Sequence, residues 1–527
     1  MNINNHEQEI IVAAVQFNPE HGNVMLNRSR MADYLGTAAE QGARLVVFPE
    51  MASSGYVWDS REEIRPFVET IPGPTTDRLH AVASQYNCYV AAGLAEIDPS
   101  SGAYYNSAVL IGPEGIIGSY RKTHLFAADP RWAREGKEEI PVFETPIGKI
   151  ALLICMDAMY FEPTRIAALK EADIIAFPTN WVGGGNNPPS RTWCLRAKEN
   201  ALYWVAANRS DRERGAQFTG GSGIIGPDGD VQDMQIAGEG IVFGTIMLDA
   251  EKRRHILNSR RPHAYQELLL HPYLWKEGET RNLPVPASFE IILVPCKPDN
   301  SPLPERLTSA FKTLETPQEA AANRVYVLPE LEIGTGIALG EEIIQQLQKL
   351  AADVSGFIVA ALAEKDTRRD QRIVYLIGQD GIVGQADSVH GNRLNPHLFR
   401  TFELPFGRVG ILAGEDARYP ESYRVLAKQG ADIIAVSSNG SEAGATWMRR
   451  IWAFENDAII AAAAPWGSKE SLLFLHRQVH QEGDTGEEHF GQTFHPEMLE
   501  AVRSRPFMKR LNTHLYDRLV QVRWRGR

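Results

Sequence analysis

The chain of 527 residues carries the same succession of sequence segments twice, in the same order. The segment ARLVVFPE at 43–50 returns as NRVYVLPE at 323–330. Residues 143–162 align without gaps to 402–421, and nine of these twenty positions are identical. A repeat of this length indicates a duplicated folding unit, so each half is expected to form a similar fold of its own.

Each half alternates strand-like and helix-like segments. In the first half, EIIVAAVQF and RLVVFPE are apolar runs typical of buried strands. Between them, RSRMADYLGTAAEQGA has a helical pattern and ends at Gly42, a residue favoured just after a helix. The segment YNSAVLIGPEGIIGSY predicts a hairpin, which adds antiparallel pairing to the sheet. The pattern therefore predicts an α/β layered fold with a mixed sheet.

The polar, proline-containing stretch KEGETRNLPVPAS at 276–288 is typical of a linker. We accordingly predict a first domain at 1–280 and a second at 281–467. The similarity between the halves fades after AFENDAIIAAAAPWG, and residues 468–527 are interpreted as a separate C-terminal tail. The end of this tail is basic, but its apolar and aromatic residues favour a segment packed on the protein.

Composition excludes several classes of protein. The net charge of −12 argues against a general nucleic-acid binder. No apolar run approaches the roughly 20 residues of a membrane-spanning helix, and the N-terminus lacks the pattern of a secretory signal. Four scattered cysteines suit a reducing compartment better than a disulfide framework. We therefore expect a cytoplasmic protein that binds a small-molecule substrate and neither nucleic acid nor membrane.

Three residues of the first half have the chemistry of a covalent catalyst. Glu50 and Cys155 each end a buried apolar strand, and Lys122 closes the second strand of the hairpin. Ligands of α/β sheets collect at the carboxyl ends of strands. A thiol needs a base, a partly buried glutamate can be that base, and an ammonium can stabilise a tetrahedral intermediate. Alone, each residue is more often structural, and it is their joint placement that predicts attack on a carbon bonded to nitrogen.

The segments VVFPE, YRKTHLF and LLICMD resemble the three signature segments of the nitrilase, or carbon–nitrogen hydrolase, superfamily. The resemblance covers most of residues 10–270 and implies an αββα sandwich without a cofactor or metal. It also implies that Glu50 is the general base, Lys122 the oxyanion helper and Cys155 the nucleophile.

Many members carry a second glutamate between the lysine and the cysteine. In this sequence the matching place holds Asp129, with Glu135 as the alternative.

The residues around the nucleophile bear on the substrate. Nitrilases often have a Trp-Glu pair after the cysteine, whereas this chain has Met156-Asp157, which favours an amide or N-carbamoyl substrate over a nitrile. Tyr56, Asn180 and Trp181 are candidate pocket walls, and packing at strand ends explains them equally well. Nitrile hydrolysis and a non-catalytic scaffold or sensor are the alternative functions.

The second half lacks two of the three candidate catalytic residues, the lysine and the cysteine. The counterparts of the glutamate, lysine and cysteine are Glu330, Ser388 and Gly414. His124 and its counterpart His390 survive in both halves, which favours a structural role for this histidine. We expect the degenerate half to pack on the active half as an intramolecular pseudo-dimer. Binding of a regulator in the degenerate pocket, and further homo-oligomers, are left open.

Overall fold

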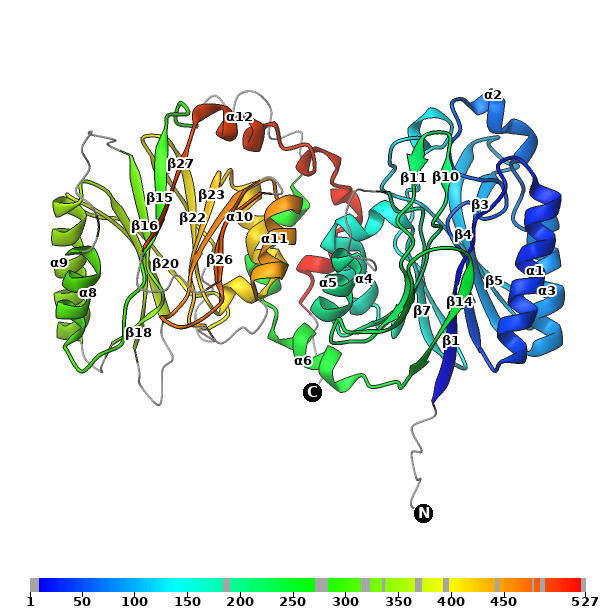
Figure 1. Ribbon diagram of the computed structural model, residues 1–527, viewed down its shortest axis with the longest axis horizontal. Helices are drawn as coiled ribbons and strands as arrows, with labels where there is room; N and C mark the ends of the chain where they lie inside the picture. Colours follow the sequence, from blue (N-terminus) through cyan, green and yellow to red (C-terminus); the bar gives the residue numbers. More distant parts are fainter. Residues whose placement is uncertain are drawn as a thin grey trace, which may run out of the picture. The chain divides into compact units, whose positions relative to one another are not determined.

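The computed structural model forms two compact units, Met1–Ser259 and Arg260–Arg527, each built from two sheets with helices on their outer faces (Figure 1). The residues that it describes are 9–182, 190–270, 283–312, 314, 323–333, 337–364, 372–391, 398–440, 445–475, 478–483 and 489–522.

The first unit contains two six-stranded sheets that pack face to face. The first sheet has the order β14-β1-β2-β3-β4-β5 and contains β1 (Ile10–Gln16), β2 (Leu45–Val47), β3 (Tyr89–Ile97), β4 (Tyr104–Gly112), β5 (Gly115–Arg121) and β14 (Gly240–Ile246). The second sheet has the order β13-β12-β9-β8-β7-β6 and contains β6 (Val142–Thr145), β7 (Gly148–Leu152), β8 (Ile174–Pro178), β9 (Tyr203–Ala207), β12 (Ser222–Ile225) and β13 (Val231–Gln235). Strands β1, β2 and β3 are parallel, and the β3–β4–β5 meander is antiparallel, so the sheet is mixed as the sequence predicts.

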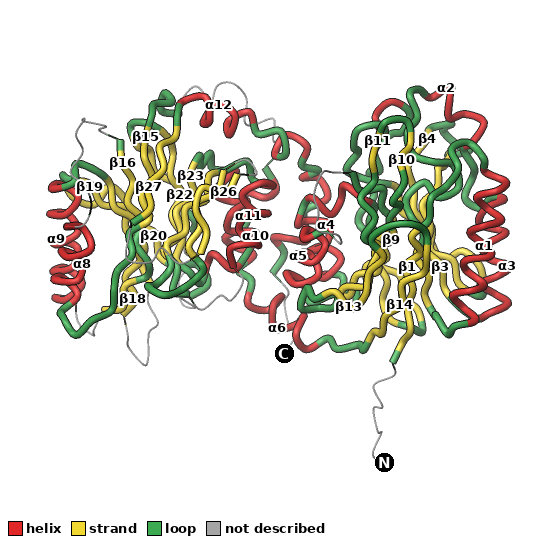
Figure 2. Tube along the Cα trace, in the orientation of Figure 1, coloured by secondary structure: helices red, strands yellow, loops and turns green. Residues whose placement is uncertain are grey.

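Two pairs of helices cover the outer faces of the two sheets (Figure 2). They are α1 (Val24–Glu40) and α3 (Pro74–Tyr86) on the first sheet, and α4 (Phe161–Leu169) and α5 (Arg191–Asn200) on the second. Asn23 caps α1 by accepting a hydrogen bond from the backbone of Leu26, and α3 starts with Pro74, a residue suited to the first helical turn. The unit is therefore an αββα sandwich, and α6 (Glu251–Ser259) ends it.

The second unit repeats this architecture. Its first sheet has the order β20-β19-β18-β16-β15-β27, and β17 also pairs with β18; the strands are β15 (Phe289–Leu293), β16 (Arg324–Val327), β17 (Leu331–Ile333), β18 (Phe357–Glu364), β19 (Arg372–Gly378), β20 (Gly381–Asp387) and β27 (Phe490–Phe494). Its second sheet runs in the order β21-β22-β23-β24-β25-β26, with β21 (Thr401–Leu404), β22 (Gly407–Ala413), β23 (Ile433–Ser437), β24 (Ile459–Ala463), β25 (Ser471–Leu475) and β26 (Gln478–Gly483). The helices α8 (Leu303–Lys312) and α9 (Ile337–Asp353) cover the first sheet, and α10 (Pro420–Lys428) and α11 (Ala445–Glu455) the second (Figure 1).

The segment 260–270 follows the first repeat in sequence but belongs to the second unit. Lys428 on α10 donates hydrogen bonds to the carbonyls of Leu268 and Leu270, at 2.8 and 2.7 Å. The division that the sequence predicts at 280/281 lies among residues 271–282, outside the described residues.

The prediction of a separate tail from residue 468 differs from the structure. Strand β25 pairs with β24 and with β26, and β27 pairs with β15, so the tail completes both sheets of the second unit. The basic end that follows is held by ion pairs and burial: Arg503 contacts Asp432 at 2.8 Å, and Leu519 is fully buried. No helix in the described residues is long and apolar enough to cross a membrane.

Candidate active site

Glu50, Lys122 and Cys155 come together at strand ends of the first unit. Glu50 lies shortly after β2, Lys122 directly after β5, and Cys155 opens the 3-10 helix η3 (Cys155–Met159) after β7. The Nζ atom of Lys122 lies 2.7 Å from Oε1 of Glu50. Both side chains are fully buried, and Cys155 is 4% exposed. The two sheets thus supply a carboxylate, an ammonium and a thiol to one enclosed region.

Lys122 is held between two carboxylates. Its Nζ atom also lies 2.6 Å from Oδ2 of Asp129, at the start of the 3-10 helix η2 (Asp129–Arg131). Of the two carboxylates considered from the sequence, Asp129 is therefore the one in contact with the lysine, and Glu135 is exposed. Asn106 on β4 donates to Glu50 at 2.7 Å and to Asp129 at 3.0 Å, which fixes the two carboxylates relative to each other. The sequence reasoning missed Asn106, although a polar residue within a buried strand is a signal for such a role.

The charges of this cluster shift its pKa values. Burial raises the pKa of Glu50, the ammonium of Lys122 lowers it, and the carboxylate of Asp129 raises it, so that the net shift is upward. Burial alone would lower the pKa of Lys122, but Asp129 and Glu50 raise it well above its usual value. Lys122 is therefore a permanent cation, and Glu50 is a carboxylate with increased affinity for a proton.

Cys155 combines an unusual backbone with an unreactive resting thiol. Its φ of 43° lies in the left-handed region, which a non-glycine residue adopts only when its surroundings enforce it. Burial raises the pKa of the thiol, the charge of Glu50 raises it further, and Lys122 lowers it. The thiol is thus neutral at rest and lies within the electrostatic reach of both a base and a cation.

Two further contacts position Glu50. The backbone N–H of Asn180 donates to Oε2 of Glu50, and the side-chain amide of Asn180 donates to its carbonyl, both at 2.8 Å. Gly93 allows β3 to lie close to the backbone at Glu50, because a Cβ atom on residue 93 would lie 2.5 Å from Cα of Glu50. The second unit has Ala361 at the position of Gly93. The close approach is therefore a requirement of the first unit alone.

Tyr56 and Trp181 have different surroundings. The ring of Tyr56 lies 5.9 Å from Nζ of Lys122, and its hydroxyl donates to the carbonyl of Phe126 at 3.0 Å. Trp181 packs edge-on against Trp193, with ring centroids 5.4 Å apart. Tyr56 thus forms a wall of the lysine site, whereas the contacts of Trp181 are those of a packing residue.

Asp157, two residues after the cysteine, joins the loop of the nucleophile to the loop of the lysine. It accepts hydrogen bonds from Tyr120 at 2.9 Å, from the backbone of Ile154 at 2.9 Å and from the backbone of His124 at 3.2 Å. The imidazole Nδ1 of His124 also lies 2.9 Å from the same carboxylate.

The second unit has the same aspartate–histidine contact, since Nδ1 of His390 lies 2.7 Å from the carboxylate of Asp416. A His-Asp pair that is present where the cysteine is absent has a structural role, in agreement with the interpretation of His124 from the sequence.

The corresponding region of the second unit is rebuilt. Glu330 is paired with Arg372 at 3.1 Å, and Arg372 occupies the strand position of Asn106. Gly414 replaces the cysteine, and a Cβ atom on it would lie 2.9 Å from the backbone nitrogen of Asn439. At the equivalent place the second unit therefore retains a carboxylate and a cation, but Gly414 supplies no thiol and the backbone of Asn439 leaves no space for one.

The connections around the site are also longer in the first unit. Between Glu50 and the bridge from Glu69 to Glu96, the chain makes an excursion through residues 51–68, which contribute Tyr56 and Trp58 to an apolar cluster. In the second unit, Ile333 already makes the equivalent pairing three residues after Glu330. The part of the chain that encloses the lysine site therefore has no counterpart between Glu330 and Ile333, a stretch that the structure describes in full.

The hairpin of β10 (Arg212–Glu213) and β11 (Ala216–Gln217) supports this excursion. Glu213 accepts hydrogen bonds from the backbones of Tyr56 and Val57, at 2.9 and 2.6 Å. In the second unit the connection between β24 and β25 is residues 464–470, about half the length of residues 208–221 between β9 and β12. The two connections form one supported enclosure in the first unit.

Comparison with known proteins places the chain in a family. The model of the carbon-nitrogen hydrolase family matches residues 11–253 and 303–488, so the chain belongs to that family, in two successive copies. It is a carbon–nitrogen hydrolase of the amidase-like kind.

A nitrilase from Pyrococcus abyssi is 39% identical over 251 residues, which is 47% of this chain and 94% of that protein. A probable nitrilase from Schizosaccharomyces pombe is 33% identical over 273 residues, 49% of this chain and 98% of that protein. An (R)-stereoselective amidase from a Pseudomonas species is 32% identical over 256 residues, 48% of this chain and 89% of that protein. Each match spans about half of this chain and nearly all of the relative.

Within the described residues, no group of three or more His, Cys, Asp or Glu side chains is placed to hold a metal ion. The four cysteines are free and buried.

Proposed function

We propose that the first unit hydrolyses the C–N bond of a small linear amide or N-carbamoyl compound through a thioester on Cys155. The observation that carries this proposal is the buried Lys122–Glu50 pair at 2.7 Å, whose two charges act on the thiol of Cys155. The amidase among the relatives supports an amide as the substrate class.

In the first half of the reaction, Glu50 takes the thiol proton while the sulfur attacks the carbonyl carbon. The oxygen becomes an oxyanion next to the ammonium of Lys122, which keeps its proton because its pKa is raised. Glu50 then gives its proton to the leaving nitrogen. The C–N bond breaks, ammonia or an amine departs, and the acyl group remains on the sulfur.

In the second half, Glu50 takes a proton from water as the water oxygen attacks the thioester carbon. A second oxyanion forms and collapses, the C–S bond breaks, and the thiolate recovers the proton from Glu50. The products are the carboxylic acid and the regenerated thiol. The raised pKa of Glu50 suits a group that has to both accept and release a proton in each half.

The test is ammonia release from amides and N-carbamoyl amino acids by the full-length protein and by Cys155→Ala. Cys194→Ala is the matched control, since Cys194 is a buried thiol of the same unit on α5. We expect Cys155→Ala to lose turnover and Cys194→Ala to keep it. Intact-mass measurement during turnover should detect one acyl adduct, removed by hydroxylamine. Turnover by Cys155→Ala at the rate of the parent protein would refute the proposal.

Nitrile hydrolysis is the second candidate, because two of the relatives are named as nitrilases. The same thioester would form after attack on the nitrile carbon, addition of water and loss of ammonia. Paired substrates with one acyl group, such as propionamide and propionitrile, separate the two functions. A larger kcat/KM on the amide supports amide hydrolysis, and a larger value on the nitrile supports the alternative.

The rebuilt site of the second unit, with Gly414 in place of the cysteine, supports a non-catalytic role for that unit. We propose that it stabilises the catalytic unit as the second member of an intramolecular pseudo-dimer. Hydrogen exchange in increasing urea tests this, because a pseudo-dimer should unfold in one cooperative step seen by peptides of both units. Two separate transitions, with activity lost only in the transition of the first unit, would refute it.

A further inference from the structure

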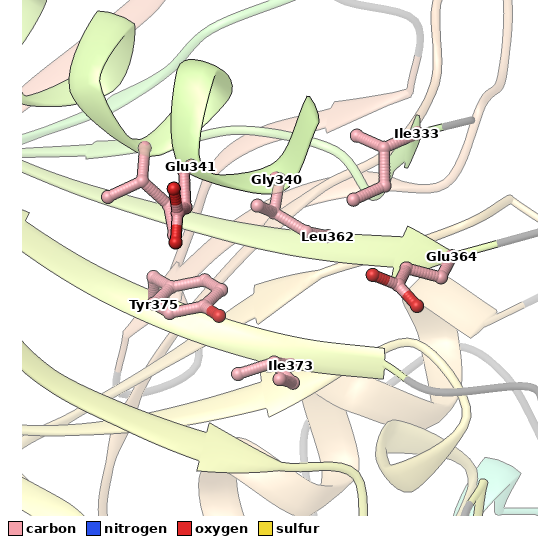
Figure 3. Close-up of a pocket in the computed structure, with 8 residues that line it drawn as sticks. Ile333, Gly340, Glu341, Leu362, Glu364, Ile373 and Tyr375 are labelled. Carbon is pink, nitrogen blue, oxygen red and sulfur yellow. The ribbon is translucent and has the colours of Figure 1, made fainter. Parts of the chain in front are cut away.

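A cavity of about 160 Å³ lies in the second unit, between α9 and the strands β17, β18 and β19 (Figure 3). Its residues include the apolar side chains Ile333, Leu362 and Ile373, the phenol of Tyr375, and two carboxylates, Glu341 and Glu364. Figure 3 shows the carboxylate of Glu341, on α9, above the ring of Tyr375, and that of Glu364, at the end of β18, to the right of the ring. A cavity of roughly 150 Å³ accommodates benzene in another protein, so this one has room for a small organic body.

The first unit has a paired carboxylate at the equivalent strand position. Glu96 occupies the strand position of Glu364, because the bridge from Glu69 to Glu96 corresponds to the pairing of Ile333 with Glu364. Glu96 forms an ion pair with Arg121 and accepts a hydrogen bond from Ser107. The carboxylate in the first unit is thus neutralised by an arginine of the neighbouring hairpin.

The second unit has lost both of these partners. Ser107 pairs with Arg121 across β4 and β5, and the same register position across β19 and β20 pairs Ile373 with Asp387. A methyl-bearing side chain therefore replaces the hydroxyl, and a carboxylate replaces the guanidinium.

Within the part of the chain that the structure describes, neither Glu364 nor Glu341 forms a hydrogen bond or an ion pair. Burial, together with the charges of Asp387 and Glu364, raises the pKa of Tyr375, in keeping with a negative potential at this cavity. Arg372, the nearest cation along β19, is paired with Glu330. The cavity thus combines an apolar floor with two carboxylates, Glu341 and Glu364, that the described residues do not neutralise.

We propose that this cavity binds a small organic ammonium ion, with its apolar body over Ile373 and Leu362 and its charge at Glu364. The external ammonium takes the place that Arg121 has in the first unit. The cavity volume limits the body to roughly the size of a benzene ring. A polar substituent of the ligand can project toward Glu341, because Glu341 is exposed on α9 and the cavity is open to water on that side.

The test is calorimetric titration of the full-length protein with benzylamine at pH 7.5, against benzyl alcohol as the neutral probe of the same shape. We expect saturable binding of benzylamine and binding of benzyl alcohol that is at least about tenfold weaker, since hydrogen bonds between charged groups are stronger than those of a neutral hydroxyl. Glu364→Gln should remove this preference. Glu342→Gln is the matched control, because Glu342 is an exposed neighbour on α9 outside the cavity lining.

A cavity-filling variant locates the site independently of charge. A Cβ atom on Gly340 would lie 3.8 Å from Ile333, an ordinary contact, so Gly340→Leu fills the cavity without a backbone clash. We expect this variant to fold, with its thermal midpoint unchanged or raised, and to lose benzylamine binding. Three results would overturn the proposal: no saturable binding, equal binding of the two probes, or unaltered binding in Gly340→Leu.

Discussion

Replacing Lys122 by methionine tests the electrostatic balance of the site directly. The substitution leaves Glu50 and Asp129 buried without the ammonium that contacts both, at 2.7 and 2.6 Å. Removing one partner of a buried ion pair costs about 3–5 kcal/mol, and here one cation serves two carboxylates. We expect the free energy of unfolding of the first unit to fall by about 3–5 kcal/mol at pH 8.

The pH dependence has a definite sign. Without the ammonium, burial and the charge of Asp129 raise the folded-state pKa of Glu50 above the unfolded value, as burial already does in the parent. The folded variant then gains a proton as the pH falls, while the unfolded chain gains it only at lower pH. Stability is therefore recovered toward pH 5.5, by up to about 1.4 kcal/mol per pH unit for each proton taken up.

Hydrogen exchange with mass spectrometry is the assay, because peptides of the second unit are an internal reference. Lys149→Met is the matched control: Lys149 also contacts two carboxylates, Glu171 at 3.0 Å and Glu144 at 3.4 Å, but at the surface. It should cost at most about 1 kcal/mol at either pH. If Lys122→Met costs no more than this control, or costs the same at pH 8 and pH 5.5, the reasoning about the buried cluster is refuted.

Two further predictions concern the two sites. Asp129→Asn removes a charge that raises the pKa of Glu50, so the acid limb of the kcat/KM profile should move to lower pH, by up to about 1 unit; a limb that stays in place or moves to higher pH contradicts this. Gly414→Cys in a Cys155→Ala background should restore no activity, because its Cβ atom would meet the backbone nitrogen of Asn439 at 2.9 Å, and unfolding should become easier by about 1–3 kcal/mol. Ammonia release and urea denaturation check this last expectation, and any gain of turnover would show that the second site is only chemically, not sterically, disabled.

The sequence predicts the layered fold and the position of three site residues because both depend on short-range patterns. Buried strands are visible as apolar runs, and Glu50 and Cys155 stand where such runs end. Asn106 and Asp157 were missed because their roles depend on which loops meet in space. The sequence names two carboxylates for the position beside the lysine, Asp129 and Glu135, and only the fold shows which one reaches it.

The prediction of a separate C-terminal tail fails for a different reason. The repeat signal fades where β25, β26 and β27 begin, since their sequences have diverged while their hydrogen-bonding positions have been kept. Backbone pairing is largely independent of side-chain identity, so loss of sequence similarity does not imply loss of the strand. The cavity beneath α9 was equally invisible, because it depends on which side chains of α9, β17, β18 and β19 face one another in the fold.

The short connection from Glu330 to Ile333 shows what the fold looks like without the long connection 51–68 of the first unit. A sandwich of the same layers forms without the excursion 51–68, so that excursion is not a requirement of the architecture. Its sequence is consequently free to change with the molecule that it has to enclose. Engineering of substrate range in this enzyme can begin by exchanging that one segment, with Glu213 as the anchor to preserve.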